Sequence, residues 1–278
     1  MVRWAAMEPI HVGVLLVLGL GAGVFGGLLG IGGSVIMIPV LGFILGWPFH
    51  LAQAAAMTVN PAVALTAALR HRKAKNVSVT TVTRVIPLSI ICISLAAWGS
   101  NQLQAAYLEA GFGLFLLWVL WDQLSALRPS QLHKELHIEG DKTTWTRAGL
   151  TGGVTGTMAG LLGIGGGLIQ VPLLNRLCKL PLRKAIGSSS AIMFFTAVIG
   201  ATVKDASLSE ILENTNAPFH PSHAILGALC LIPGALLGGW IGAKISTSVP
   251  IKAIRIVFAL LVAWASFKMF HSSLSALL

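Results

Sequence analysis

Long apolar runs separated by short polar stretches take up most of this 278-residue chain. A helix needs about 20 such residues to cross the hydrocarbon core of a bilayer, and most of the runs approach that length. Only 10% of the residues are charged, against about 25% in an ordinary soluble domain. The sequence therefore predicts an all-α, polytopic membrane protein. Its ten apolar segments span residues 10–29, 34–46, 51–69, 85–99, 104–122, 148–163, 167–178, 185–203, 223–243 and 254–271.

Three of these segments need separate interpretation. Segment 10–29 is long enough to span and has no small-residue cleavage site before its glycine-rich part, so we interpret it as a membrane segment and not as a secretion signal. Segments 34–46 and 167–178 are too short to cross alone. Each follows a glycine cluster, which is typical of the return arm of a broken hairpin. The sequence thus predicts 8 to 10 transmembrane segments.

An internal repeat is the strongest signal after hydrophobicity. Residues 27–41 read GLLGIGGSVIMIPVL and residues 160–174 read GLLGIGGGLIQVPLL, with ten of the fifteen positions identical. Further along, Ala54-x-x-x-Thr58 matches Ala185-x-x-x-Ser189 if the connecting loop differs by two residues. The chain is therefore predicted to contain two five-segment repeats, a recurring design in secondary transporters. The predicted units are a first repeat at 1–127, a polar cytoplasmic linker at 128–147, and a second repeat at 148–278.

The positive charges predict the orientation of the repeats. If the ten segments alternate sides, four basic clusters lie on one face, which the positive-inside rule makes cytoplasmic. An acidic loop with Asp205, Glu210 and Glu213 would then lie outside, where the first repeat has a basic loop inside. The two repeats are therefore expected to be inverted, in the cytoplasmic (inner) membrane of a cell, with both termini outside. The clusters are Arg70, Arg72, Lys73, Lys75 and Arg84; Arg128, Lys134, Lys142 and Arg147; Arg176, Lys179, Arg183 and Lys184; and Lys244, Lys252 and Arg255.

The two glycine clusters are the main candidates for a binding site. Glycine permits positive φ, and a half-helix that begins after such a break directs unpaired N–H groups and the positive end of its dipole at an anion. Tight helix packing is the alternative explanation. Pro39 and Pro172, five residues into each arm, are expected to break the arms and keep them irregular. The candidate residues are Gly30, Gly32, Gly33, Ser34, Gly163, Gly165, Gly166 and Gly167.

Polar side chains in the following segments extend this candidate site. Hydroxyl and amide groups donate to an oxyanion without the cost of a buried charge. The alternative is that they bond to the backbone of their own helix or to a neighbouring helix. The candidates are Thr58 and Asn60, the serines Ser188, Ser189 and Ser190, and Gln170.

Charged residues within the apolar segments are scarce. Glu109 is the one acidic residue well inside a segment, and intramembrane carboxylates often carry protons. It is a candidate for coupling, although it lies close enough to the segment's start to reach the interface. Lys204 and Asp205 are expected to form a local ion pair at the outer end of segment 185–203.

Several other functions lack their motifs. The stretch Gly21-Ala22-Gly23-Val24-Phe25-Gly26 matches GxGxxG, but no strand precedes it, so no dinucleotide site is expected. The series Gly234, Gly238 and Gly242 predicts a close helix–helix contact. The three cysteines are far apart, and neither a disulfide nor a metal site is expected. No Walker, HExxH or GxSxG motif is present, so we expect no enzyme activity, no cofactor and no nucleic-acid partner.

The paired GLLGIGGS/GxxIxxP motifs, each followed by a segment with small and Ser/Thr residues, resemble the TauE/SafE family of membrane transporters, also called sulfite exporters. The resemblance covers nearly the whole chain. It implies transport of sulfite, sulfoacetate, thiosulfate or a related small organic anion without ATP hydrolysis. One departure is that Met57-Thr58-Val59-Asn60-Pro61 stands where the second half has the more family-like Gly187-Ser188-Ser189-Ser190. The two halves are thus expected to contribute unequally.

Three functions remain open from the sequence. The first is a secondary transporter of a small anion such as sulfite, another sulfur oxyanion, a small organosulfonate or a carboxylate, as exporter or importer. The second is a non-transporting membrane scaffold or accessory subunit, and the third is an anion channel. The expected partners are the anion and the lipid bilayer, and the sequence leaves a homodimer open.

Overall fold

The computed structural model describes residues 9–128, 140–215, 218–246 and 250–277. These residues form ten α-helices and, within the same ranges, no strand. The all-α fold predicted from the apolar segments is confirmed. The helices are α1 (Pro9–Leu29), α2 (Ser34–Phe43), α3 (Phe49–Lys73), α4 (Val79–Asn101), α5 (Ala105–Ala126), α7 (Trp145–Leu162), α8 (Gly167–Arg176), α9 (Leu182–Asn214), α10 (Ser222–Ile245) and α11 (Ile251–Leu277).

Six of these helices are long and apolar enough to cross a membrane: α1, α3, α4, α5, α9 and α10. The protein is therefore a multi-pass membrane protein. By contrast, α2 and α8 have 10 residues each, which gives them a length of about 15 Å. Neither crosses a bilayer alone, as the sequence predicted for these two segments.

The largest difference from the predicted segments is in α9. This helix has 33 residues and continues to Asn214, whereas the sequence placed the end of the segment at residue 203. Asp205, Glu210 and Glu213 therefore lie in the helix and not in an outer loop. An apolar window ends where charges begin, but a helix supported by its neighbours continues through them.

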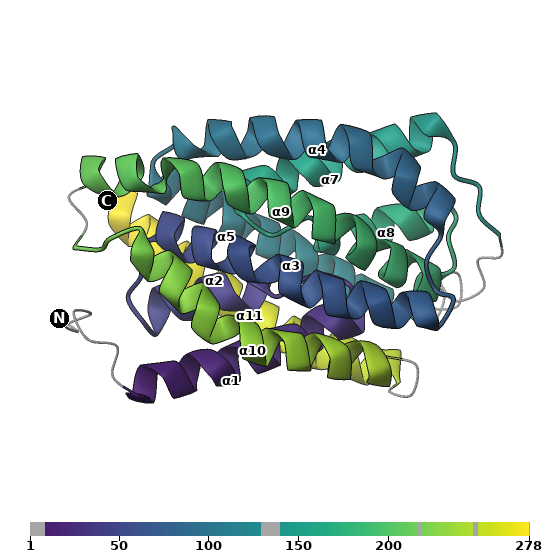
Figure 1. Cartoon of the computed structure of the whole chain (residues 1–278), viewed down its shortest axis with the longest axis horizontal. Coiled ribbons are helices and arrows are strands. Elements are labelled where there is room, and N and C mark those ends of the chain that lie inside the picture. Colours follow the sequence, from purple (N-terminus) through teal and green to yellow (C-terminus); the bar gives the residue numbers. More distant parts are fainter. Residues whose placement is uncertain (1–8, 129–139, 216–217, 247–249, 278) are drawn as a thin grey trace.

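The helices run roughly along one axis, with their ends at two opposite faces (Figure 1). At one face, α3 ends and α4 begins, α7 and α11 begin, and α8 and α10 end. The described residues of all four basic clusters lie at or near this face, which we call the basic end. Most of the predicted linker 128–147 lies outside the described residues, and its last three residues belong to α7.

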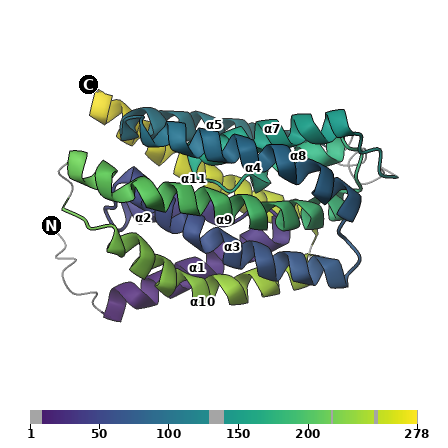
Figure 2. The ribbon, with the colours of Figure 1, turned by 45° about the horizontal axis from the view of Figure 1, so that its top comes forward.

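The two halves of the chain make equivalent contacts. The helix α1 packs along α10 and α7 packs along α4, while the central helices α3 and α9 pack on each other (Figure 2). The ends of α1 and α7, the whole of α2 and α8, and the starts of α3 and α9 are all separated by 133 residues. The predicted two-residue difference in the loop is therefore wrong. The serine triplet at 188–190 corresponds to Ala55, Ala56 and Met57, so it has no polar counterpart.

Glycines allow the two outer helix pairs to approach closely. A Cβ atom added to Gly238 on α10 would lie 2.2 Å from the Leu20 carbonyl oxygen of α1, and one added to Gly156 on α7 would lie 2.5 Å from the Ser89 carbonyl oxygen of α4. The predicted close contact along Gly234, Gly238 and Gly242 is confirmed. In lipid, such backbone approach is a main source of helix association.

Gly238→Ala is expected to destabilise the protein because its Cβ meets backbone, which yields only if α1 and α10 separate. Overpacking of this kind costs about 1–3 kcal/mol, measurable as a lower midpoint of thermal unfolding in detergent. Gly21→Ala on α1 is the matched control, since nothing lies within 4 Å of its added Cβ. Equal midpoints for the two variants would contradict this packing.

A hydrogen-bonded loop joins the starts of α4 and α7 at the basic end. Ser78 Oγ donates to Asp141 Oδ2 over 2.6 Å, and the Thr143 N–H donates to Asp141 Oδ1 over 3.0 Å. Burial acts to raise the pKa of Asp141, but the hydrogen bonds from Ser78, Thr143 and Thr81 outweigh it, so this pKa lies below its ordinary value. The Ser78 N–H also donates to Ser188 Oγ over 2.9 Å, which attaches the loop to α9.

Candidate functional site

Both glycine clusters form sharp turns, each between a long helix and a short one. The φ angles are +68° at Gly30 and +78° at Gly32, and they are +72°, +67° and +90° at Gly163, Gly165 and Gly166. Side chains with a Cβ rarely adopt this left-handed region. The positive φ predicted from the glycine pattern is thus present at these positions, whereas Gly33 has a φ of −98° and Gly167 is the first residue of α8.

The two turns touch each other in the interior. A Cβ added to Gly167 would lie 2.6 Å from the Gly30 carbonyl oxygen and 2.6 Å from Ile31 Cα. The starts of α2 and α8 therefore meet, although 133 residues separate them in the chain. All residues from 30 to 34 and from 163 to 167 are buried.

Asn60 of α3 lies against both turns. Its side chain is 0% exposed; Oδ1 accepts from the Gly33 N–H over 3.1 Å, and Nδ2 donates to Ser34 Oγ over 2.6 Å. A Cβ added to Gly165 would lie 2.9 Å from Asn60 Nδ2. One amide therefore fixes the start of α2 and covers the other turn.

Met193 of α9 occupies the equivalent place in the second half. A Cβ added to Gly32 would lie 2.9 Å from Met193 Sδ, and one added to Gly165 would lie 3.3 Å from Met193 Cγ. Asn60 and Met193 are 133 residues apart, the same spacing that relates the turns. The centre is thus polar on the α3 side and apolar on the α9 side.

The second side of the centre has its own hydrogen bonds. Ser189 Oγ lies 2.8 Å from the Gly30 carbonyl oxygen and 3.1 Å from Gln170 Oε1. A hydroxyl has one hydrogen, so it donates to one of these oxygens at a time. Thr196 Oγ1 lies 3.2 Å from the Gly165 carbonyl oxygen. The sequence analysis missed Thr196, although its position seven residues after Ser189 places it on the same helix face.

Other predicted site residues lie elsewhere. Thr58 Oγ1 lies 2.9 Å from the Ala54 carbonyl oxygen of its own helix and 3.0 Å from Asp205 Oδ2. Ser188 faces the loop before α4, and Ser190 donates to the Ile186 carbonyl oxygen over 3.1 Å. Gly163 lies on the Gln53 side chain, and Gly166 lies against Thr155 and Ala159 of α7.

Pro39 and Pro172 lie inside α2 and α8, which continue through them as regular helices. The prediction that the prolines keep the arms irregular is wrong. Each proline lies only five residues from the start of its helix, so the hydrogen bond that it removes falls at the first turns, where few backbone bonds exist in any case. The break in each hairpin is made by the glycines alone.

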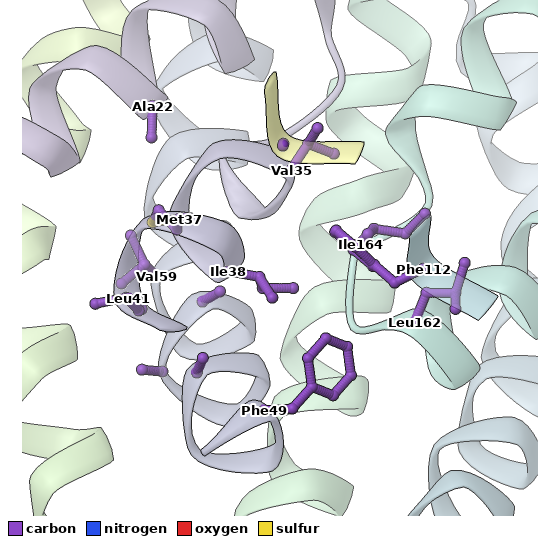
Figure 3. Packing of buried hydrophobic residues seen from close by; sticks show 14 of the residues in the cluster. Ala22, Val35, Met37, Ile38, Leu41, Phe49, Val59, Phe112, Leu162 and Ile164 are labelled. Carbon is purple, nitrogen blue, oxygen red and sulfur yellow. The ribbon is translucent and has the colours of Figure 1, made fainter. Parts of the chain in front are cut away.

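Apolar side chains fill the space between the turns and the end of the bundle opposite the basic end. Figure 3 shows Ile164 and Leu162 next to Phe112 of α5, with Ile38 of α2 and Phe49 of α3 on the other side. All of these belong to one buried hydrophobic cluster. The Phe49 and Phe112 rings are 5.9 Å apart in an edge-to-face arrangement. The route from the turns in this direction is closed by these side chains.

On the other side, a pocket extends from the turns to the basic end. Ile31 and Leu168 line it next to the turns, and Asn175, Gln123 and Arg255 line it further out. Its volume of about 40 Å³ suffices for a small ion or a few water molecules. The remaining lining residues are Leu29, Asp122, Val171, Pro172, Leu182 and Ile186.

The pocket carries an excess of positive charge. Arg255 on α11 is 7% exposed, and Asp122 on α5 is bound by Arg176 Nη2 over 3.0 Å. Two guanidinium groups thus meet one carboxylate. The sequence had placed Arg255 in a loop cluster, because the apolar window of the last segment begins close to it.

A buried polar group lies on the closed side. Lys204, 2% exposed, donates to Gln53 Oε1 over 2.9 Å, and Asp205 accepts from Thr58. Within the described residues no ion pair joins Lys204 to Asp205, so the expected local ion pair is not formed. We call Lys204, Asp205, His50, Gln53 and Thr58 the Lys204 cluster. Glu109, the predicted coupling residue, lies near the start of α5 and is half-buried.

Comparison with known proteins identifies the relatives of this architecture. The family model described as "Sulfite exporter TauE/SafE" matches residues 15–269. No solved structure matches the chain.

Curated relatives carry transporter names. The "Probable membrane transporter protein MamO" of Paramagnetospirillum magneticum is 27% identical over 93% of this chain, and that of Magnetospirillum gryphiswaldense is 26% identical over 91%. The chain spans only 44% of the length of each MamO protein. The "Probable membrane transporter protein YunE" of Bacillus subtilis is 27% identical, and the match covers 88% of this chain and 92% of YunE.

Proposed function

We propose that this chain, which belongs to the sulfite exporter TauE/SafE family, is a secondary transporter that carries a small anion across the membrane. The family and the named relatives are membrane transporters. For the substrate we propose sulfite, another sulfur oxyanion, or a small organosulfonate or carboxylate. The observation that carries this proposal is the contact between the starts of α2 and α8 in the interior.

Two helix starts in contact favour a negative guest. The N-cap positions of α2 and α8 are Gly33 and Gly166, and no side chain caps either helix. The first N–H groups of a helix have no partner within the helix, and the dipole adds partial positive charge there. Anions bind at such places, and neutral donors nearby hold them without a fixed charge. We propose that the anion is held by Gly30, Gly32, Gly33, Ser34, Asn60, Gly165, Gly167, Gln170 and Ser189.

We further infer that the two halves are inverted repeats. In Figure 1, α1 begins near the left end of the bundle and α7 near the right, and the contacts of the halves exchange as such a duplication requires. By this symmetry, α7 and α11 cross the membrane like α1 and α5, while α2 and α8 reach only part of the way. Eight helices then span, and the basic end faces the cytoplasm by the positive-inside rule.

The pocket gives the anion a route from the basic end to the turns. Arg255 lies in its wall and supplies a buried positive charge. A guanidinium presents several N–H donors in a fixed plane, which suits an oxyanion. We propose Arg255 as the residue that attracts the anion into the pocket.

Arg255→Gln is expected to raise the KM for anion uptake about tenfold or more, with a smaller change in the maximal rate. A hydrogen bond to a charged group contributes about 1.5–3 kcal/mol, and 1.4 kcal/mol corresponds to a factor of ten. Lys252→Gln is the matched control, because Lys252 is an exposed basic residue one turn earlier on α11. Similar KM values for the two variants would rule out this role.

Proteoliposome flux tests the proposed function directly. Purified protein is reconstituted, and uptake of labelled sulfite is measured with thiosulfate, sulfoacetate and acetate as competitors. A secondary transporter gives uptake that saturates with sulfite and that trans-anion accelerates by exchange. A channel gives flux that follows the membrane potential without acceleration by trans-anion. Absence of saturable flux for all of these anions, with correctly inserted protein, would favour a scaffold and overturn the proposal.

A further inference from the structure

The Lys204 cluster is a buried ionisable group that the anion site does not use. Lys204 lies on α9, on the closed side of the glycine turns, and its side chain is among the largest fully buried ones in the described residues. Its hydrogen-bond partner is the neutral amide of Gln53 on α3. A buried charge normally has an opposite charge beside it, because desolvation is costly. Lys204 has a neutral acceptor in that place.

The other charged and titratable groups near Lys204 are few. His50 on α3 lies within electrostatic range of it, and the ring Nε2 of His50 is 3.2 Å from the Leu103 carbonyl oxygen. Asp205, the next residue on α9, is directed at Thr58, and its other oxygen, Oδ1, is buried without a hydrogen-bond partner. From α4, Asn101 contributes an amide that donates to the Val203 carbonyl oxygen over 3.4 Å. The charge of Lys204 is therefore not neutralised by direct contact.

A chain of two hydrogen bonds connects Lys204 to the second glycine turn. Lys204 Nζ donates to Gln53 Oε1, and Gln53 Nε2 donates to the Leu161 carbonyl oxygen over 3.2 Å. Leu161 lies in the last turn of α7, and a Cβ added to Gly163 would lie 2.9 Å from Gln53 Cγ. A change in the charge of Lys204 thus acts on the side chain that supports this turn.

We propose that Lys204 is the proton-coupling residue of the transporter: it takes up one proton when the anion binds and releases it when the anion leaves. The inference rests on the proposed anion transport and adds its coupling ion. Protonation turns the neutral amine into an ammonium, so that a monoanion and its proton enter the protein as a neutral pair. That avoids the cost of moving an uncompensated charge into the interior. Lysine is suited to this task because, unlike arginine, it releases its proton in proteins.

Proton counting in proteoliposomes tests the proposal. Vesicles contain a pH-sensitive dye, and labelled thiosulfate is added outside, or labelled sulfite if thiosulfate is not carried. Protein-free vesicles give the correction for protons that the anion itself releases. We expect the wild-type protein to acidify the interior by one proton per monoanion, or two charges' worth less one for a dianion, and an acidic exterior to accelerate uptake severalfold.

Variants assign the coupling to Lys204. Lys204→Gln and Lys204→Arg are both expected to lose the acceleration and the acidification while downhill anion exchange continues. Lys204→Arg keeps a positive donor for Gln53, which preserves the fold if the glutamine variant does not purify. Lys184→Gln, an exposed lysine at the start of the same helix, and Asp205→Asn are expected to remain coupled.

The outcomes separate this inference from the proposed function. Saturable anion flux without proton movement in the wild-type protein overturns the coupling and leaves the transport function intact. Coupling that persists in both Lys204 variants, or that disappears in Asp205→Asn alone, overturns the assignment to Lys204. Absence of flux for every anion overturns the proposed function first, and the coupling with it.

Discussion

Gly167→Ala is expected to abolish anion flux. The added Cβ would lie 2.6 Å from the Gly30 carbonyl oxygen and from Ile31 Cα, both backbone atoms of the other turn. Backbone held in a turn of two left-handed glycines has little freedom to move away. The starts of α2 and α8 must therefore separate or rotate, which misplaces the N–H groups proposed to hold the anion. An error of about 1 Å in such a geometry costs on the order of a hundredfold in rate.

The control for Gly167→Ala is Gly99→Ala, whose Cβ meets nothing within 4 Å. The two variants make the same chemical change in buried or partly buried helix, so a difference in sulfite flux reports the contact between the turns. Size-exclusion profiles and thermal midpoints in detergent identify any variant that has simply unfolded. Wild-type flux from a folded Gly167→Ala protein would show that the meeting of the turns is not the transport site.

Asn60→Leu is expected to lower both stability and flux strongly. It removes the acceptor of the buried Gly33 N–H and the donor to Ser34 Oγ. Each buried polar group left without a partner costs about 1–3 kcal/mol. We expect a lower thermal midpoint and little uptake. Thr66→Val on the same helix is the control, because the Thr66 hydroxyl bonds only to the Ala62 and Val63 carbonyl oxygens of its own helix.

Asn60→Asp separates the structural role of Asn60 from its electrostatic role. The aspartate keeps an oxygen for the Gly33 N–H, and the Ser34 hydroxyl is able to turn and donate to it. Much of the stability should therefore remain. The new negative charge would repel an anion at the turns, so uptake should still be lost. A fully active Asn60→Asp protein would contradict an anion site next to this residue.

The hairpins were predictable because their signals are local. A GIGG cluster followed by a 10-residue apolar arm fixes a break and a short helix whatever surrounds it, and both are present at Gly30 and Gly163. The duplication was also visible in the letters of the two motifs. The close packing along Gly234, Gly238 and Gly242 follows from the absence of side chains on one helix face.

The remaining features depend on neighbours that are distant in sequence. Lys204 looked like the end of a segment because hydropathy averages over a window, yet it is buried by α3 and bonded to a residue 151 positions away. Met193 carries no polar atom of note, so only the repeat spacing relates it to Asn60. The loop between the motif and the next helix was misaligned because Ala and Ser recur at several offsets in this stretch, and only the helix starts decide among them.

The pocket at the basic end has a counterpart that is filled. The residues 133 positions away from its inner lining include Ile38, Phe49 and Ile164, which close the opposite side in Figure 3. Two equivalent halves thus hold unequal shapes, as in carriers with inverted repeats. If the halves traded shapes, the gate of phenylalanine and isoleucine would open and the arginine-lined mouth would shut. The chain then stands in its inward-facing form, and its outward-facing form is already specified by the same set of contacts with the halves exchanged.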